Sequence, residues 1–587
     1  MLCFIGNTSL VTALGNECDT IHAIENNQSG LYYSEKYNAV VGEIPARAFD
    51  NITSKVNFTK FESLIIQNIK NVLPTENDID DDTLLVISTT KGNVHLLENN
   101  TAVIDNNCFL YTSAIKIADY LKFKRKPIVI SNACISGVSA FVVAKNLMSS
   151  DDTIKNVVVV GCDILSEFIV EGFRSFKSLS NKPCKPYDAN RDGLSLGEAC
   201  GAVLLTKDIN LASKPLIVLK GGAVTNDANH ISGPSRTGDG LYYAMKEALN
   251  DAEVLGADVK YVNMHGTATL YNDEMESKAI QWSCLSNVPV NSFKGYIGHT
   301  LGASGVVETI LCIYQMRNNI VFATKGFEKR GTPCKLDVSD ANRSYTDVNI
   351  CLKTASGFGG CNAAIVLVKN PVNAYNNAEK PNASIGGEDN IKVLAQYSLP
   401  NSSECFSDFI RKEYKQLNLS YMKFYKMSDL SKALFIASEN IIRQCPEIVN
   451  ANPRRVAIIM SNKVSSLEAD IQHQQIVDKH LEEGASPAIF VYTLPNVAVG
   501  EVCIKNKIKG DNTFFIENFN TGLSEYYAKQ LLRLNKADIV ICGWCDKEIA
   551  SEMPMDESRI NANSDLEKMR GIKNDNYWNV NLKILSK

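Results

Sequence analysis

Short apolar runs separated by helical segments and glycine-rich turns dominate the first 370 residues of the chain. Runs at 83–88, 128–131, 157–161 and 200–205 each have the length of a buried strand, and the segment 137–148 is typical of a helix. The arrangement recurs after residue 216, with apolar runs at 261–264, 288–291 and 363–368 and a helix extending to residue 316. Such alternation predicts an α/β protein whose largely parallel sheet is covered on both faces.

The same pattern predicts how the chain divides into domains. Residues 371–391 are rich in Asn, Pro and Gly, which is typical of a linker. The residues after about 551 are polar and weakly patterned, so we expect a loosely ordered tail. The predicted parts are a first half at 1–212, a second half at 213–370, the linker at 371–391, a further α/β unit at 392–550 and the tail at 551–587.

The unit after the linker contains segments that repeat the first half. Residues 490–493, 513–524 and 537–546 echo residues 109–112, 127–139 and 156–163, in the same order and at similar spacing. Chance likeness between α/β units is the alternative. Aligning Gly522 with Gly137 places Phe519 where Cys134 stands. Phenylalanine cannot act as a nucleophile, so this unit is predicted to keep a fold without its chemistry.

Composition and charge narrow the class of protein. The chain has 587 residues, of which 45% are hydrophobic and 21% charged, and its net charge of −5 argues against general nucleic-acid binding. Its 17 cysteines are scattered without a repeated spacing, as expected of a reduced intracellular chain. The apolar N-terminus has no preceding basic residues and is too short to span a membrane. We therefore expect a cytoplasmic protein that does not insert into a membrane.

Candidate chemistry begins at Cys134, within the predicted strand, turn and helix of residues 127–140. A cysteine at a helix N-terminus faces unpaired N–H groups and the positive end of the helix dipole, both of which favour a thiolate. A buried structural cysteine is the alternative. The chain has only seven histidines, and two of them, His265 and His299, border glycines just after predicted strands. Strand ends are where α/β sheets bind ligands, so these histidines favour a catalytic cysteine.

A charged, loop-rich block follows the third predicted strand. Asp188, Arg191, Asp192 and Glu198 lie close together in the sequence, and we expect them to form one group. The alternative is that they are separate polar residues of an exposed loop. That alternative explains each residue alone but explains the group of four less well.

Taken together, these motifs resemble one family. Residues 133–137 around Cys134, 191–198, 265–269, 294–303 and 357–360 are similar to the β-ketoacyl-(acyl carrier protein) synthases, over roughly residues 1–370. Position 299 is histidine, where the initiating Cys-His-Asn branch of the family has asparagine. The chain therefore resembles the elongating Cys-His-His branch. The resemblance implies a thiolase-like αβαβα layered sandwich of two similar halves. The unit after the linker would then be a third, partial half.

The resemblance also implies a reaction and its residues. Cys134 would carry the acyl group, and malonyl-ACP would undergo decarboxylative Claisen condensation with it in fatty acid or polyketide/polyene biosynthesis. The enolate would be stabilised by His265 and His299. Lys294 would pair with Glu276 to hold the histidines, with Glu198 and Asp273 in support. Phe358, between Gly357 and Gly359, would form a loop that gates the acyl pocket. The backbone N–H groups of Phe358 and Cys134 would donate hydrogen bonds to the oxyanion.

The implied partners follow from the same likeness. They are an acyl carrier protein, whose phosphopantetheine arm brings the substrate, and a second copy in a homodimer. No metal or other cofactor is implied. Four departures from the family pattern, at Ile135, Ala268, residues 354–356 and Cys361, affect no catalytic group, although Ile135 could reshape the acyl pocket.

Two other functions are alternatives to a β-ketoacyl synthase. A non-catalytic partner similar to chain-length factors would lack the cysteine, which this chain keeps. A CoA-dependent thiolase would need a second active cysteine in a different motif.

Overall fold

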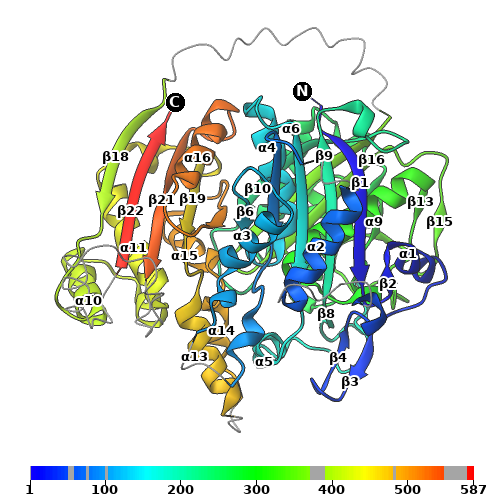
Figure 1. Ribbon diagram of the computed structural model, residues 1–587, viewed down its shortest axis with the longest axis horizontal. Helices are drawn as coiled ribbons and strands as arrows, with labels where there is room; N and C mark the ends of the chain where they lie inside the picture. Colours follow the sequence, from blue (N-terminus) through cyan, green and yellow to red (C-terminus); the bar gives the residue numbers. More distant parts are fainter. Residues whose placement is uncertain are drawn as a thin grey trace.

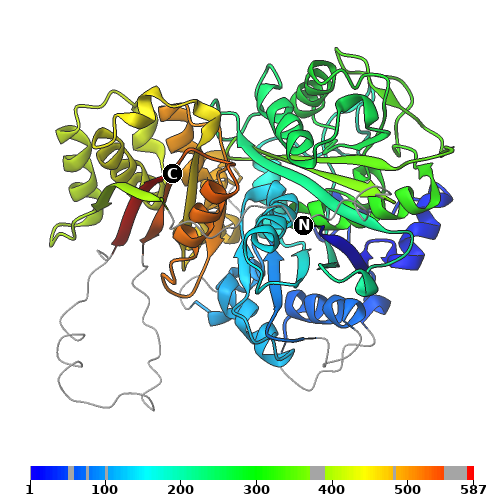
Figure 2. The same ribbon diagram turned by 90° about the horizontal axis from the view of Figure 1, so that it is seen from above.

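The computed structural model describes residues 2–49, 58–73, 79–99, 104–370, 390–479, 484–547 and 578–587. Nearly all of the predicted linker and residues 548–577 of the predicted tail region lie outside them. Three α/β units follow one another along the chain, and Figures 1 and 2 show the third unit beside the first. We call them the first half, the second half and the third unit, beginning at β1, β10 and β18 respectively.

The first half confirms the strands predicted from its apolar runs. Its strands are β1 (Phe4–Thr12), β2 (Gly15–Asn16), β3 (Tyr32–Ser34), β4 (Ala39–Gly42), β5 (Thr83–Ser88), β6 (Ile128–Ile130), β7 (Asn156–Asp163), β8 (Leu196–Gly197) and β9 (Ala199–Thr206). Its helices are α1 (Glu17–Glu25), α2 (Lys60–Val72), α3 (Leu110–Tyr120), α4 (Ser136–Ser150) and α5 (Glu167–Ser175). The five main strands lie in the order β1–β9–β7–β5–β6, with β7, β5 and β6 parallel.

The second half repeats this order. Its strands are β10 (Ile217–Asn226), β11 (Tyr261–Asn263), β12 (Pro289–Asn291), β13 (Ile320–Val321), β14 (Asp337–Val338), β15 (Arg343–Ser344), β16 (Ile350–Gly357) and β17 (Cys361–Lys369). Its helices are α6 (Asp239–Ala252), α7 (Leu270–Trp282), α8 (Lys294–Ile297) and α9 (Ser304–Asn318). The order β10–β17–β16–β11–β12 matches that of the first half strand for strand.

The helices α4 and α9 follow equivalent strands and pack against each other between the two halves. Gly137 and Gly305 make this possible, because a Cβ on either residue would lie within 2.8 Å of the other helix's backbone. Residues 133–150, which include α4, are long and apolar enough to cross a membrane, but 78% of the segment is buried inside the protein. Burial of this kind is expected for the central helix of a layered α/β core.

The third unit has the same strand order again. Its strands are β18 (Lys392–Ser398), β19 (Val456–Asn462), β20 (Phe514–Ile516), β21 (Ile539–Lys547) and β22 (Trp578–Ser586). Its helices are α10 (Phe406–Gln416), α11 (Asp429–Arg443), α12 (Glu447–Asn450), α13 (Leu467–Asp478), α14 (Pro487–Tyr492), α15 (Asn496–Asn506) and α16 (Leu523–Arg533). The sheet order is β18–β22–β21–β19–β20.

The end of the chain corrects one prediction. The expectation of a loose polar tail over 551–587 is wrong for residues 578–586, because they form β22 inside the third sheet, between β18 and β21. Apolar and polar residues alternate along this strand, and Trp578, Val580 and Leu582 are buried. Strand β22 joins β18 to β21, so the sheet of the third unit is continuous only with residues 578–586 in place.

The first half and the third unit are joined edge to edge. Strand β20 pairs antiparallel with β6, with Phe515 opposite Ile130 and Ile516 opposite Val129. The Asn132 side chain extends the junction, because its Oδ1 accepts a hydrogen bond from the Phe514 N–H at 2.8 Å. Two residues later the chain reaches Cys134, so the third unit contacts the turn that carries the candidate nucleophile.

Candidate active site

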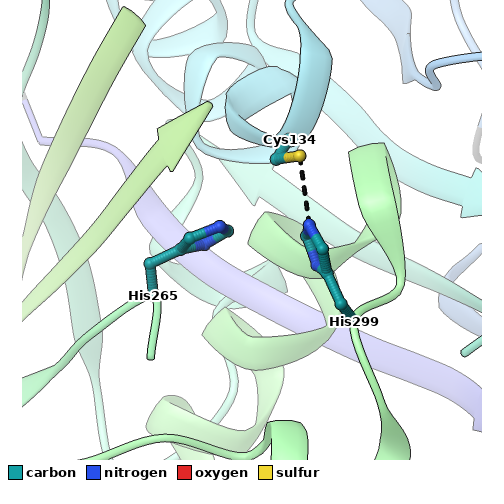
Figure 3. A group of neighbouring side chains, drawn as sticks. All are labelled: Cys134, His265 and His299. Atoms are coloured by element: carbon teal, nitrogen blue, oxygen red, sulfur yellow. Dashed lines mark hydrogen bonds between the residues drawn. The ribbon is translucent and has the colours of Figure 1, made fainter. Parts of the chain in front are cut away.

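Cys134, His265 and His299 converge at the ends of strands from both halves (Figure 3). Cys134 follows β6, His265 lies just after β11, and His299 lies between β12 and α9. The His299 Nε2 atom is 3.0 Å from the Cys134 Sγ atom. The two imidazole rings are perpendicular to each other, with centroids 5.0 Å apart. Sequence reasoning therefore identified three residues that the fold brings together.

The turn before the nucleophile has an unusual backbone. Ala133 has a φ of 48°, in the left-handed region that costs energy for a residue with a Cβ. A short 3-10 turn over Ala133–Ile135 then leads into α4. The Ser136 Oγ stabilises this turn by accepting from the Asn132 N–H at 2.8 Å and donating to the Ala133 carbonyl at 2.6 Å. The arrangement presents the Cys134 side chain to the two histidines at the start of the helix.

Burial governs the titration of the three residues. It raises the pKa of the Cys134 thiol to about 12, although Lys294 opposes the shift. Desolvation therefore opposes the thiolate that the helix terminus was expected to favour, and the thiol is the resting form. Burial, followed by the charge of Lys294, also holds the pKa values of His265 and His299 well below their usual range, so both rings are neutral.

Hydrogen bonds fix the ring of His265. The Lys294 Nζ lies 3.4 Å from His265 Nδ1 and donates to the His265 carbonyl at 2.5 Å. A lysine ammonium can only donate, so Nδ1 is the acceptor and the ring proton is on Nε2. On the other histidine, Ser304 Oγ lies 3.1 Å from His299 Nδ1.

The expected pairing of Lys294 with Glu276 is not found. Lys294 instead pairs at 2.7 Å with Glu308, which also binds Lys353 at 2.7 Å, and all three side chains are buried. Glu308 lies on α9 among apolar residues, and sequence reasoning missed it; a lone carboxylate inside an apolar helix was the available signal. The two lysines hold the pKa of Glu308 below its usual range, despite the opposing effect of burial.

Glu276 has a different role. Its two carboxylate oxygens accept hydrogen bonds from the backbone N–H groups of His265, at 2.7 Å, and Gly266, at 2.8 Å. The Tyr187 hydroxyl also donates to it, at 3.1 Å. Glu276 therefore shapes the backbone that carries His265, while Lys294 and Glu308 orient its ring.

The expected charged group at 188–198 divides into two. Arg191 forms a buried ion pair with Asp273, with 3.5 Å between Nε and Oδ2. Burial, with Glu276 adding to it, raises the pKa of Asp273 to about 7. Glu198 lies elsewhere, where it accepts from the N–H groups of Ile44 and Leu165. The single cluster expected from the sequence is thus wrong, because the chain between Arg191 and Glu198 turns into β8.

The predicted gating loop lies beside Cys134. A Cβ on Gly357 would be 3.2 Å from the Cys134 backbone nitrogen, so glycine permits this close approach. Phe358 packs on Phe173 and Phe176, with centroids 6.1 and 5.3 Å apart. Ile135 is fully buried in the core and does not line the cavity beside Cys134.

The cavity beside Cys134 is small. Its volume is about 20 Å³, room for little more than one water molecule. Residues of the third unit help to line it, namely Phe490, Thr493 and Leu494. An acyl chain can therefore enter only if the surrounding aromatic side chains move.

The three candidate catalytic side chains also have the donor types of a metal site. Their Sγ and imidazole nitrogen atoms lie within 4.8 Å of one another. Thiolate and imidazole together suit Zn²⁺, so the ion is a potential competitor for this site.

Comparisons with known proteins agree with the geometry. Residues 91–209 match the family "Beta-ketoacyl synthase, N-terminal domain", and residues 216–328 match "Beta-ketoacyl synthase, C-terminal domain". Residues 91–328 thus match both domains of this family, in the family's order. The two matches meet between β9 and β10, and Cys134, His265 and His299 all lie inside them.

Curated relatives support the same family. The 3-oxoacyl-[acyl-carrier-protein] synthase 2 of Rhizobium meliloti (strain 1021) is 33% identical over 250 residues, which cover 40% of this chain and 59% of the relative. The tetracenomycin polyketide synthase ketoacyl synthase alpha subunit of Streptomyces glaucescens is 32% identical over 256 residues, covering 41% and 59%. The chain thus spans about three fifths of the length of these relatives.

Solved structures extend the likeness in fold. "PfaC Keto synthase-Chain length factor" aligns with 100% of this chain and 78% of its own, with a TM-score of 0.76 at 13% identity. A ketosynthase (ApeO) in complex with its chain length factor (ApeC) from Xenorhabdus doucetiae covers 63% of this chain and 98% of its own, with a TM-score of 0.56 at 24% identity. The first and second halves therefore have the thiolase-like fold expected of them.

Proposed function

We propose that the protein is a β-ketoacyl-ACP synthase that condenses an acyl thioester with malonyl-ACP. The convergence of Cys134, His265 and His299 is the observation that carries this proposal. A thiol beside two neutral imidazoles supplies a nucleophile, an acceptor for its proton and two hydrogen-bond donors for an enolate. Fatty acid and polyketide/polyene biosynthesis both use this reaction, and the site's geometry supports either.

The first step loads the enzyme. His299 Nε2 accepts the Cys134 proton, the sulfur attacks the acyl carbonyl, and the carrier thiolate leaves and takes that proton. The tetrahedral oxyanion would accept from the N–H groups of Cys134 and Phe358, which the close approach of Gly357 supports. The product of this step is an acyl thioester on Cys134.

The second step forms the carbon–carbon bond. Malonyl-ACP loses CO₂, and the electrons of the broken bond form an enolate whose oxygen accepts from the Nε2–H groups of His265 and His299. For this step the His299 ring is in the tautomer whose Nδ1 accepts from the Ser304 hydroxyl. His265 already has its proton on Nε2, because Lys294 donates to Nδ1. The enolate carbon then attacks the acyl thioester, and the Cys134 thiolate leaves and takes up a proton from solvent. Each hydrogen-bond donor of this type contributes about 2.7–4 kcal/mol to such a transition state.

The partners and the compartment belong to the same proposal. We infer an acyl carrier protein as the donor of both thioesters through its phosphopantetheine arm, with no metal or other cofactor required, and a cytoplasmic location. A homodimer remains a prediction. Strand β6 already pairs with β20 of the same chain, so a second copy would have to use another surface.

We propose that the third unit is a degenerate first half with a structural role. Its strand order supports this, as does its strand–turn–helix of β20 and α16. Phe519 lies in that turn, where its ring is 54% exposed below Lys126. The non-catalytic alternative, a chain-length-factor-like partner of another ketosynthase, gains no support from the first two units, because both histidines and the cysteine are present and assembled.

Mass spectrometry tests the proposal directly. Incubation with acyl carrier protein bearing acyl groups of several lengths should add the acyl mass to a peptide that contains Cys134. The Cys134→Ala variant should show no adduct, while Cys312→Ala, which changes a buried cysteine on α9, should acylate as the unchanged protein does. Absence of the adduct from all carrier substrates, or its persistence in Cys134→Ala, would contradict the proposed activity.

A further inference from the structure

The third unit contacts the gating loop of the second half at one buried point. Helix α15 begins at Asn496, whose Nδ2 donates a 2.8 Å hydrogen bond to the Phe358 carbonyl. The Asn496 side chain is 2% exposed, and its Oδ1 has no hydrogen-bond partner among the described residues. The same Nδ2 also lies 3.6 Å from the Cys361 Sγ. A buried amide bound to the loop in this way is well placed to restrain Phe358.

Close packing reinforces this contact. A Cβ on Gly359 would lie 2.6 Å from Asn496 Nδ2, and a Cβ on Gly500, one turn along α15, would lie 2.6 Å from the Gly359 carbonyl oxygen. Neither residue can carry a side chain without displacing the loop or the helix. The gating loop and α15 therefore fit together as backbone against backbone, with Asn496 as the polar contact.

The ring of Phe358 is restrained by the same part of the third unit. Phe490 on α14 packs against Phe173, with ring centroids 5.4 Å apart, and Phe173 in turn stacks on Phe358. A Cβ on Gly172 would lie 2.1 Å from the Phe490 ring, so only glycine fits on this face of α5. Figure 1 shows α14 next to α5 at this junction.

A buried ion pair fixes the turn between α14 and α15. Lys91 of the first half lies 2.5 Å from Asp470 of α13, with both side chains buried. The Lys91 ammonium also donates to the Thr493 carbonyl, in the turn itself. The segment from Phe490 to Asn496 is thus bound to the first half on one side and to the gating loop on the other.

We propose that Asn496 is a positioning residue for Phe358, through which the third unit holds the gate closed over Cys134. The inference deepens the proposed function and rests on it, because a gate matters only if an acyl chain has to enter. Breaking the Asn496–Phe358 hydrogen bond would shift the loop toward its open state. An acyl chain entering beside Cys134 would have to displace the Phe358 ring against the same restraint.

The rate at which iodoacetamide alkylates Cys134 measures how often the gate opens, and it needs no carrier protein. Asn496→Leu keeps the side-chain volume but removes the donor, and we expect alkylation about five-fold faster, as follows from the loss of one hydrogen bond. Asn506→Ala is the matched control, because Asn506 is the last residue of α15 and its Nδ2 bonds to Glu439 and Val502 within the third unit. It should alkylate at the unchanged rate.

A second variant approaches the same contact from the other side. Gly500→Ala places a methyl group against the Gly359 carbonyl and should also accelerate alkylation, so the test survives if Asn496→Leu does not fold. The proposal is overturned if every variant that folds, as judged by its melting temperature, alkylates within two-fold of the control. The proposed activity fails separately, through absence of an acyl adduct on Cys134.

Discussion

The His299 Nε2 atom lies 3.0 Å from the Sγ atom of Cys134, and burial makes both groups neutral at rest. The contact is therefore a hydrogen bond between a thiol and an imidazole and not a preformed ion pair. Activation of the cysteine depends on a proton transfer that substrate binding has to favour. This differs from a cysteine whose thiolate is stabilised by the helix terminus alone.

The pH dependence of Cys134 alkylation follows from this arrangement. Because burial raises the thiol pKa to about 12, we expect the rate to keep rising about ten-fold per pH unit from pH 8 to pH 10. A cysteine in a short unstructured peptide should instead level off above its pKa of about 8.5. Peptide mass spectrometry across this pH range measures both rates. A plateau for Cys134 near pH 8 would contradict the raised pKa.

The two histidines should differ in which step they support. His265→Ala should slow the decarboxylation of malonyl-ACP by about 100- to 1,000-fold, the usual cost of losing one such donor, and leave acylation of Cys134 near its normal rate. His299→Ala should slow both steps, because His299 also accepts the thiol proton. Radiometric CO₂ release and the acylation rate separate the two, with the exposed His22→Ala as the control. Equal losses in acylation for both variants would argue against these roles.

The buried Lys294–Glu308–Lys353 cluster predicts a large stability effect. Glu308→Gln leaves two buried ammonium groups without a counter-charge, which should cost about 3–5 kcal/mol in the free energy of unfolding. Glu328→Gln is the control, because this exposed carboxylate pairs with Lys185 at the surface and its loss should cost less than about 1 kcal/mol. Urea denaturation measures both values, and similar values for the two variants would contradict the prediction.

The same cluster gives a pH dependence. The folded-state pKa of Glu308 is lowered from 4.5, so the folded state binds fewer protons than the unfolded state in this range. Its contribution to stability is therefore fully present above pH 4.5 and is lost as the pH falls through the folded pKa. In Glu308→Gln this part of the acid-induced loss of stability should disappear.

Added Zn²⁺ should inhibit the proposed condensation by binding Cys134, His265 and His299. Thiolate and imidazole donors within 4.8 Å of one another can share one ion, which would remove both the nucleophile and the enolate donors. We expect condensation and Cys134 alkylation to be inhibited together, and EDTA to restore both. Inhibition of condensation by Zn²⁺ without protection of Cys134 would place the ion elsewhere.

Residue patterns alone predicted much of the site, for physical reasons that can be traced. Strands such as β5 are continuous apolar runs because both faces of the sheet are covered, and this makes them visible in the sequence. Cys134, His265 and His299 were found because each follows such a strand, and the carboxyl ends of parallel strands meet at one edge of a sheet. Glycine-bordered histidines are rare enough in this chain to stand out.

What the sequence did not reveal depends on contacts between distant segments. Glu308 was missed because its two lysine partners come from other strands and helices, and nothing near it in the chain indicates a charge network. Asn496 was missed because its contact with Phe358 exists only once the third unit packs on the second half. Strand β22 was missed because the residues before it are polar, which hid a short alternating pattern.

Strand β22 leads to a last prediction about the third unit. The Trp578 side chain is fully buried, with ring centroids 4.9 Å from Phe409 and 5.1 Å from Phe406. Its Nε1–H donates to the Pro400 carbonyl at 3.1 Å. Trp578→Ala would leave a cavity between β22 and α10 and should cost about 3–5 kcal/mol. The control is Trp282→Ala, because that side chain is 66% exposed on α7.

The consequence should reach the active site, since β22 lies in the sheet that supports β20, and β20 pairs with β6 beside Cys134. We expect Trp578→Ala to lower the melting temperature and also to accelerate Cys134 alkylation at temperatures where the first two units stay folded. Hydrogen exchange should show loss of protection in β20 and in residues 490–496 under the same conditions. Destabilisation confined to α10 and β22, with alkylation unchanged, would show instead that the third unit's outer edge is independent of the site.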